Sequence, residues 1–328
     1  MIRIGILSAA HGHADSYVAQ LRPIADEARV VGLWDANAER LTKKSAQYGC
    51  PAFESADTLL AECDGVVICA ENAHHRALTE QAARAGKHVL CEKPLATTPD
   101  DARAMVDACA AAGVHLMTAF PCRFSPAFVQ LLSSVRNGDL GEILAVRGTN
   151  RGRCPGGWFI DKALSGGGAV TDHAVHVTDL LRALLDSEVE SVYCEADNHL
   201  LHGDFEDTGF IALNFDNGVF ATLDSSWSRP KTFPTWGDVT LCVTGTKGVI
   251  ELDMFSQESV LYDDARGRVA YQNWGSSADA GMVAAFVRAV REGTAAPVTG
   301  IDGLRAVEVV EAAYESVRTH QPAPVRHR

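Results

Sequence analysis

The chain has 328 residues, of which 47% are hydrophobic, so it is long enough for two domains with a sizeable core. Its formal net charge of −13 argues against nucleic acid and anionic membrane surfaces as partners, because both attract Lys and Arg. No apolar run reaches the roughly 18 residues of a membrane-spanning helix. Because the first strand-like run begins almost at Met1, we expect no leader and a cytoplasmic location.

The nine cysteines support the same compartment. Their number is odd, no two are spaced C-x-x-C, and Cys69 and Cys91 lie in apolar, strand-like runs. This pattern is typical of buried thiols in a reducing environment.

The first 120 residues alternate between strand-like and helical patterns. Apolar runs occupy residues 2–7, 28–35, 65–70, 87–92 and 115–120, and helical segments occupy 13–26, 37–49, 74–86 and 98–113. Near-continuous apolar strands separated by helices indicate a parallel sheet covered on both faces. We therefore predict a doubly wound, Rossmann-type α/β domain over residues 1–122.

The pattern changes after residue 122. A helix at 125–138, a strand at 142–151 and a glycine-rich loop at 164–170 precede a helix at 172–185, two hairpin-like segments at 209–227 and 236–254, and helices at 280–293 and 302–319. The hairpin turn "DNG" favours antiparallel pairing. Residues 123–328 are therefore predicted to form an α+β domain with a mostly antiparallel sheet that is open on one face.

The turn after the first strand lacks the glycines of a dinucleotide fingerprint. The positions of G-x-G-x-x-G are occupied by Ser8, Ala10 and His13. Ser8 and Ala10 are small enough if their φ angles stay negative, and Gly12 is available for the close approach to a phosphate. The following helix still presents free N–H groups and a positive dipole end, so the sequence predicts a degraded dinucleotide site.

Asp35 ends the second strand, where an acidic residue accepts hydrogen bonds from the adenosine ribose hydroxyls. It would repel a 2′-phosphate, so the sequence favours NAD over NADP, although the nearby Arg40 leaves NADP possible. The alternative is an ordinary exposed aspartate of a loop.

The segment "AGKHVLCEKPLATT" (residues 85–98) resembles the Gfo/Idh/MocA family, which contains relatives of glucose-fructose oxidoreductase and inositol dehydrogenase. Further matches are "PCRFSPAFVQL", "GDLGEI", "SGGGAVTDHAVHVTDLLRALL" and "VTGTKGVIELD", so the resemblance covers essentially the whole chain. It implies an NAD(P)-dependent oxidoreductase that acts on sugars, inositols or related polyols. The glycine-poor turn and "AENAHH", where relatives usually have Thr-Pro-Asn, depart from the family pattern; the latter brings the charge of Glu71 toward the nicotinamide half. Some members carry Ala-His-x-His in place of the glycines.

Three residues are the catalytic candidates. Lys93 follows a buried strand at the carboxyl edge of the sheet, where ligands bind in doubly wound folds. Asp172 and His176 are four residues apart, so both project from one face of a helix. We expect Lys93 to bind the substrate hydroxyl, His176 to act as general base, and Asp172 to position the substrate or to hold His176 in one tautomer. The alternatives are a surface salt bridge for Lys93 and a non-catalytic hydrogen-bond network for the helix pair.

The resemblance also implies the binding residues. The expected cofactor-binding residues are Ser8, Ala10, His11, Gly12, His13, Asp35, Asn72, His75, Glu92 and Lys93, and the expected substrate-binding residues are Arg123, Trp158, Lys162 and His173. The histidines His11, His13, His173 and His176 could join Asp172 in a metal site. The ring of His173 is expected to point away from Asp172, however, so no metal is predicted.

The sequence therefore predicts an NAD-dependent dehydrogenase of a secondary hydroxyl in a sugar, inositol or related polyol. Three alternatives stay open: a glycosidase or lyase of the same family that retains its NAD, a non-catalytic dinucleotide-binding sensor, and a metal-dependent hydrolase built on the histidines. Because relatives pair through the open sheet face, we also expect a homodimer or homotetramer.

Overall fold

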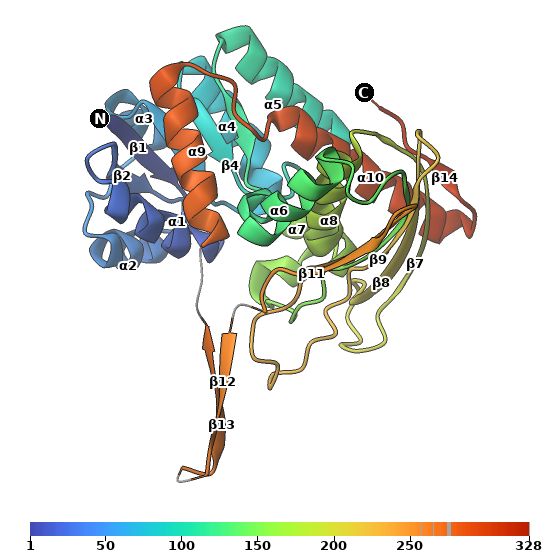
Figure 1. Cartoon of the computed structure of the whole chain (residues 1–328). Coiled ribbons are helices and arrows are strands. Elements are labelled where there is room, and N and C mark those ends of the chain that lie inside the picture. The colour runs from blue at the N-terminus through green and yellow to red at the C-terminus, as the bar shows by residue number, and fades with distance from the viewer. Residues whose placement is uncertain (257, 265, 274–276, 328) are drawn as a thin grey trace.

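The computed structural model describes residues 1–256, 258–264, 266–273 and 277–327 (Figure 1). The first sheet has five parallel strands in the order β2-β1-β3-β4-β5. The strands are β1 (Ile2–Leu7), β2 (Ala28–Trp34), β3 (Gly65–Ile68), β4 (His88–Cys91) and β5 (Leu116–Thr118). The strand order reverses between β1 and β3, and ligands of doubly wound folds bind outside the carboxyl ends of the strands at that point.

Helices cover both faces of this sheet, which confirms the doubly wound prediction. They are α1 (His13–Leu21), η1 (Arg22–Ile24), α2 (Ala38–Tyr48), α3 (Ala56–Glu62), η2 (Asn72–His74), α4 (His75–Arg84) and α5 (Pro99–Ala112). Their ends follow local sequence signals: the side chains of Asn37 and Thr98 cap α2 and α5, and Gly49 and Gly113 end the same helices with positive φ angles of 68° and 66°. The short helix α3 has no counterpart in the sequence prediction.

The second sheet has seven strands in the order β11-β10-β6-β9-β8-β7-β14. The strands are β6 (Ile143–Thr149), β7 (Val189–Asp197), β8 (Thr208–Phe215), β9 (Phe220–Asp224), β10 (Thr240–Gly245), β11 (Val249–Asp253) and β14 (Ala323–Pro324). All neighbouring pairs are antiparallel except β6 and β9, which confirms the mostly antiparallel prediction.

One face of the second sheet packs against helices, and the other is open. The helices of this half are η3 (Pro121–Phe124), α6 (Pro126–Arg136), η4 (Gly157–Ile160), α7 (Lys162–Ser165), α8 (Ala169–Leu185), α9 (Ala278–Glu292) and α10 (Gly300–Thr319). Burial alternates along β8, whose inward residues contact α8. On the open face Phe210 and Phe220 are 60% and 56% exposed, and Phe210 lines a surface depression of about 610 Å³.

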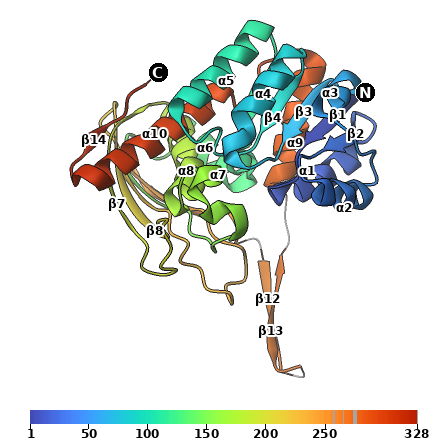
Figure 2. The same ribbon diagram turned by 180° about the vertical axis from the view of Figure 1, so that it is seen from behind.

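Two late segments lie where the sequence order does not suggest. Helix α9 packs against α1 and β1 of the first sheet, with Met282 and Phe286 buried there. The hairpin of β12 (Glu258–Asp263) and β13 (Arg268–Asn273) stands away from the body in both views (Figures 1 and 2). The domain division at residues 122–123 therefore remains a proposal, with α9 crossing it.

Two sequence-level expectations concern the environment of the chain. Among the described residues, none of the helices is both long and apolar enough to cross a bilayer. The nine cysteines are free thiols, and six of them are buried.

Candidate active site

The candidate site lies where three strands of the first sheet end. The turn after β1 (residues 8–12), the loop after β3 (residues 69–71) and the turn after β4 (residues 92–94) meet at the β1/β3 switch point. The second half of the chain adds the first turn of α8, which begins directly after Gly166–Gly168. Lys93 of the first half and Asp172 of the second half are thereby brought together.

Ser8 does not keep the negative φ angle that the sequence analysis required of it. Its φ is +67°, the left-handed conformation that glycine usually provides and that costs other residues roughly 1–2 kcal/mol. Its hydroxyl donates to Asp35 Oδ2 (3.0 Å) and accepts the N–H of Ala10 (3.2 Å). Two side-chain hydrogen bonds thus hold the turn in the conformation of the missing glycine. The expectation of a negative φ angle at Ser8 was therefore wrong.

The N–H groups of this turn are largely used within the protein. Those of Ala9 and Ala10 bind the side chains of Asp35 and Ser8, and that of His11 binds Cys69 O. The N–H of His13, the first residue of α1, binds the ring of His11 at 3.1 Å. In a glycine turn such groups are available to a pyrophosphate. Here side chains of the turn occupy several of them.

Asp35 is buried at one end of the site, directly after β2. It accepts hydrogen bonds from Ser8 Oγ, from the N–H groups of Ala9 and Asn37, and from Arg40 Nε at 2.7 Å. Burial alone would raise the pKa of Asp35, but the Arg40 guanidinium and the backbone N–H groups outweigh it and lower the pKa. The exposed-loop alternative for Asp35 was therefore wrong.

Glu71 lies near the same end of the site. Its Oε1 is 3.3 Å from Arg40 Nη2, so its charge is paired with the guanidinium that also binds Asp35. The sequence analysis expected this charge to lie close to the nicotinamide half. Glu71 is instead paired on the Asp35 side of the site, where Arg40 contacts both carboxylates.

Lys93 and Asp172 form a buried ion pair between the two halves of the chain. Lys93 lies two residues after the end of β4, and its peptide bond to Pro94 is cis. Its Nζ lies 2.6 Å from Asp172 Oδ1 and 3.2 Å from Asp172 O. Burial alone would raise the pKa of Asp172, but Lys93 and His173 outweigh it and hold the pKa well below its usual range. Because Lys93 is 4% exposed, it is not part of a surface salt bridge.

The second carboxylate oxygen of Asp172 is held by two further side chains. Trp227 Nε1 donates to Oδ2 at 3.2 Å, and His173 Nε2 lies 3.3 Å from the same atom. The expectation that the ring of His173 points away from Asp172 was therefore wrong. Trp227 follows β9, fifty-five residues from Asp172, and no local signal in the sequence indicates its contact.

His176 lies one turn further along α8, and its ring packs edge-on against Phe120. No hydrogen bond joins it to Asp172 among the described residues, so of the two roles expected for Asp172 only substrate positioning stays a prediction. Its Nδ1 is buried and has no partner there. Burial and the nearby Lys93 lower the pKa of His176, so the ring is neutral and able to accept a proton.

Glu206 and Tyr314 shape the glycine turn before α8, and the sequence analysis missed both. Glu206 Oε1 accepts the N–H groups of Gly168 and Val170 and the Tyr314 hydroxyl. A Cβ at Gly167 would lie 2.1 Å from the Tyr314 hydroxyl, so only glycine fits there. Glu206 thus binds N–H groups at the start of α8 and fixes the helix that carries Asp172.

Asn72 and His75, both predicted to contact the cofactor, have different surroundings. Asn72 Nδ2 donates to Ser165 O at 2.8 Å, while its buried Oδ1 has no partner among the described residues. The ring of His75 lies within hydrogen-bond distance of the carbonyl oxygens of Ala70, Pro94 and Leu95 and is fully buried. His75 therefore braces the turn that carries Lys93.

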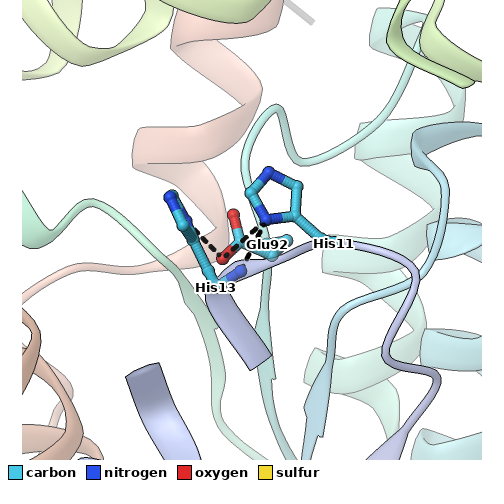
Figure 3. Close-up of side chains that lie close together, drawn as sticks. All are labelled: His11, His13 and Glu92. Atoms are coloured by element: carbon cyan, nitrogen blue, oxygen red, sulfur yellow. Dashed lines mark hydrogen bonds and ion pairs between the residues drawn. The ribbon is translucent and has the colours of Figure 1, made fainter. Parts of the chain in front are cut away.

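Figure 3 shows how His11, His13 and Glu92 lie together. Their candidate ligand atoms lie within 4.8 Å of one another, a different group from the metal set considered from the sequence. His13 Nδ1 is 3.1 Å from Glu92 Oε1, and His11 Nδ1 accepts the His13 N–H. Both Nδ1 atoms are thus engaged in contacts within the protein.

Three further predicted residues occupy distinct places. Arg123 binds Asp179 and Asp302 through its guanidinium, which gives it a structural contact between η3, α8 and α10. Trp158 Nε1 donates to Ala10 O at 3.2 Å, so η4 packs on the β1 turn. Lys162 is exposed and borders a cavity of about 400 Å³ that also includes Glu206. None of these contacts tests a substrate-binding role.

Comparison with known proteins shows which family this chain belongs to. The family model described as an oxidoreductase family with an NAD-binding Rossmann fold matches residues 2–120, and that of the GFO/IDH/MocA C-terminal domain matches residues 128–251. The chain is 30% identical over 336 residues to D-apiose dehydrogenase of Paraburkholderia graminis, covering 97% of this chain and 87% of that protein. This chain belongs to the Gfo/Idh/MocA family of oxidoreductases.

One further relative and one solved structure are similar to the chain. The chain is 27% identical over 329 residues to myo-inositol 2-dehydrogenase of Thermotoga maritima, covering 96% of both chains. Its fold matches the crystal structure of GenD2 from gentamicin A biosynthesis, solved in complex with NAD, with a TM-score of 0.91 at 24% identity over 99% of this chain and 97% of that one. As a Gfo/Idh/MocA protein, this chain is an NAD-binding oxidoreductase whose phosphate turn is built without glycine at the three fingerprint positions.

Proposed function

We propose that this protein is an NAD-dependent dehydrogenase that transfers a hydride between a secondary hydroxyl of a sugar, inositol or related polyol and nicotinamide. The observation that carries the proposal is the buried Lys93–Asp172 pair, with neutral His176 one turn away on α8. The named activities of the relatives, myo-inositol 2-dehydrogenase and D-apiose dehydrogenase, support the substrate class.

The proton of the substrate hydroxyl is the part of the reaction that these side chains handle. The Lys93 ammonium donates a hydrogen bond to the hydroxyl oxygen and stabilises its negative charge as the O–H bond breaks. Neutral His176 accepts the proton, and Asp172 keeps Lys93 in place. Nicotinamide, when bound, supplies the hydride acceptor.

Several observations fit a dinucleotide bound at the candidate site. His11 Nε2, Asn72 Oδ1 and His176 Nδ1 are buried polar atoms without protein partners among the described residues, and such atoms commonly face a ligand. The Asp35 carboxylate suits ribose hydroxyls and disfavours a 2′-phosphate, while Arg40 is already engaged by two carboxylates. The remaining cofactor assignments, Ser8, Ala10, Gly12, His13 and Glu92, are part of the same proposal.

The decisive experiment is an NADH titration followed by energy transfer from tryptophan, with NADPH in parallel, and then a screen of polyols for NADH formation. Saturation at micromolar NADH, weaker binding of NADPH and NADH formation with at least one polyol are expected. Failure to bind either nucleotide at millimolar concentration would contradict the proposal. Conversion of a glycoside without net NAD reduction would favour the NAD-retaining alternative.

The open face of the second sheet supports a homodimer or homotetramer, because Phe210, Phe220 and Tyr193 form an exposed apolar surface there. Light scattering at micromolar protein concentration should give a mass of at least twice 35.1 kDa.

The free cysteines support a cytoplasmic location, where thiols stay reduced.

A further inference from the structure

The ring of His11 has a defined tautomer. Its Nδ1 accepts the backbone N–H of His13 at 3.1 Å, so this nitrogen carries no proton. Burial lowers the pKa of His11 to about 3, so the ring is neutral and its single proton lies on Nε2. His11 therefore presents one fixed, uncharged N–H group.

That N–H group has no acceptor among the residues that the structure describes. His11 is 5% exposed, and its Nε2 is buried without a partner among the described residues. In Figure 3 this nitrogen points away from the Glu92 carboxylate. The ring lies edge-on to Trp158 and Phe159 of the second half, and the charges of Lys93 and Asp172 act on it. A buried donor at this place, between the two halves of the chain, is positioned for a ligand of the candidate site.

We propose that His11 is a ligand-binding residue that replaces backbone donors of the missing glycine turn: it caps α1 through Nδ1 and donates through Nε2–H to an oxygen of the bound ligand. The acceptor is a phosphate or carboxamide oxygen of the coenzyme or a hydroxyl oxygen of the polyol. The inference rests on the proposed function and adds the donor, its tautomer and its lack of charge. Ala9, Ala10 and His13 use their own N–H groups within the turn, so the donor is moved from the backbone to a side chain.

Two variants separate the two nitrogen atoms of the ring. In His11→Asn the amide oxygen branches from the same carbon as Nδ1, so it can still accept the His13 N–H, but nothing replaces Nε2–H. In His11→Gln the amide nitrogen corresponds to Nε2, so a donor remains while the cap of α1 is weakened. Melting temperature, NADH dissociation constant and polyol KM are measured for both variants and for the wild type.

We expect His11→Asn to melt close to the wild type and to bind one ligand about tenfold more weakly, whereas His11→Gln melts lower and binds within a few-fold of the wild type. A change in NADH affinity identifies a coenzyme oxygen, and a change in KM at unchanged NADH affinity identifies a substrate oxygen. Wild-type affinities in His11→Asn, or losses in both variants that follow the melting temperature, would overturn the inference alone. Failure of the wild type to bind NADH would instead overturn the proposed function and this inference with it.

Discussion

Two buried aspartates of the candidate site differ in what holds them. Asp35 accepts hydrogen bonds from two backbone N–H groups, a serine and an arginine. The carboxylate of Asp172 is held by three side chains, those of Lys93, Trp227 and His173. Both have a lowered pKa. The contrast fits the proposed division, in which Asp35 recognises the coenzyme and Asp172 keeps Lys93 in place.

Replacing Lys93 by Met should give the largest effect. The variant removes the only ammonium that contacts Asp172 among the described residues, so we expect kcat to fall about 10²- to 10⁴-fold while NADH affinity stays within a few-fold. Steady-state kinetics and the NADH titration measure both. Lys43→Met, on the exposed surface of α2, is the matched control. Turnover at the wild-type rate in Lys93→Met would remove the proposed division between the two aspartates.

Replacing Asp35 by Asn should affect binding instead of catalysis. The amide keeps the size of the side chain but loses the charge and places an N–H group among donors, so NADH affinity should fall about tenfold. The affinity for NADPH should fall less, because Arg40 is released from one of its two carboxylate partners. Parallel titrations with both nucleotides test this. An unchanged NADH-to-NADPH preference would show that Asp35 does not recognise the ribose.

Replacing Trp227 by Phe tests one of the side chains that hold the Asp172 carboxylate. The change deletes one hydrogen bond to Oδ2 and keeps an aromatic ring against Phe205, so kcat should fall about three- to tenfold with little change in KM. Trp236→Phe is the control, since that ring also touches His173 but is 45% exposed. Equal kinetics of the two variants would mean that the Trp227 N–H does not position Asp172.

The smallest predicted effect concerns pH and His13. Burial opposes protonation of this ring, but Glu92 outweighs burial and raises the pKa above 6.5. Protonation therefore stabilises the fold fully below pH 6.5, and this contribution is lost as the pH rises through the higher folded pKa. Because the side chain is 41% exposed, the difference in unfolding free energy between wild type and His13→Gln should be about 0.5–1 kcal/mol at pH 6 and vanish at high pH.

Denaturant unfolding of both proteins at several pH values measures this difference. His74→Gln, at an exposed histidine on η2, is the matched control. A constant difference between wild type and His13→Gln across the pH range would contradict the ion pair with Glu92.

The parts of the fold that sequence predicted well depend on local patterns. The apolar runs that became β1, β3 and β4 are buried on both faces, and helix ends follow their caps and glycines. The motif around Lys93 and the four-residue spacing of Asp172 and His176 indicated the site, because parallel strands end at one edge and a helix repeats every 3.6 residues.

What sequence could not predict depends on contacts between distant residues. The positive φ of Ser8 is held by Asp35, and the side of α8 on which the His173 ring lies is set by packing against Trp236 and Gly152. Glu206, Tyr314 and Trp227 reach the site from three separate segments. Backbone angles and side-chain rotamers of this kind are set by tertiary structure, which a local pattern does not contain.

The position of α9 has a consequence for the order in which the molecule can be completed during synthesis. This helix, residues 278–292, covers the first sheet beside α1 and packs Phe286 close to Gly65. At roughly 5–20 residues per second, a ribosome that has finished the five parallel strands needs on the order of ten seconds or more to deliver it. Throughout that interval the nascent first sheet exposes apolar surface that only a much later part of the chain can bury.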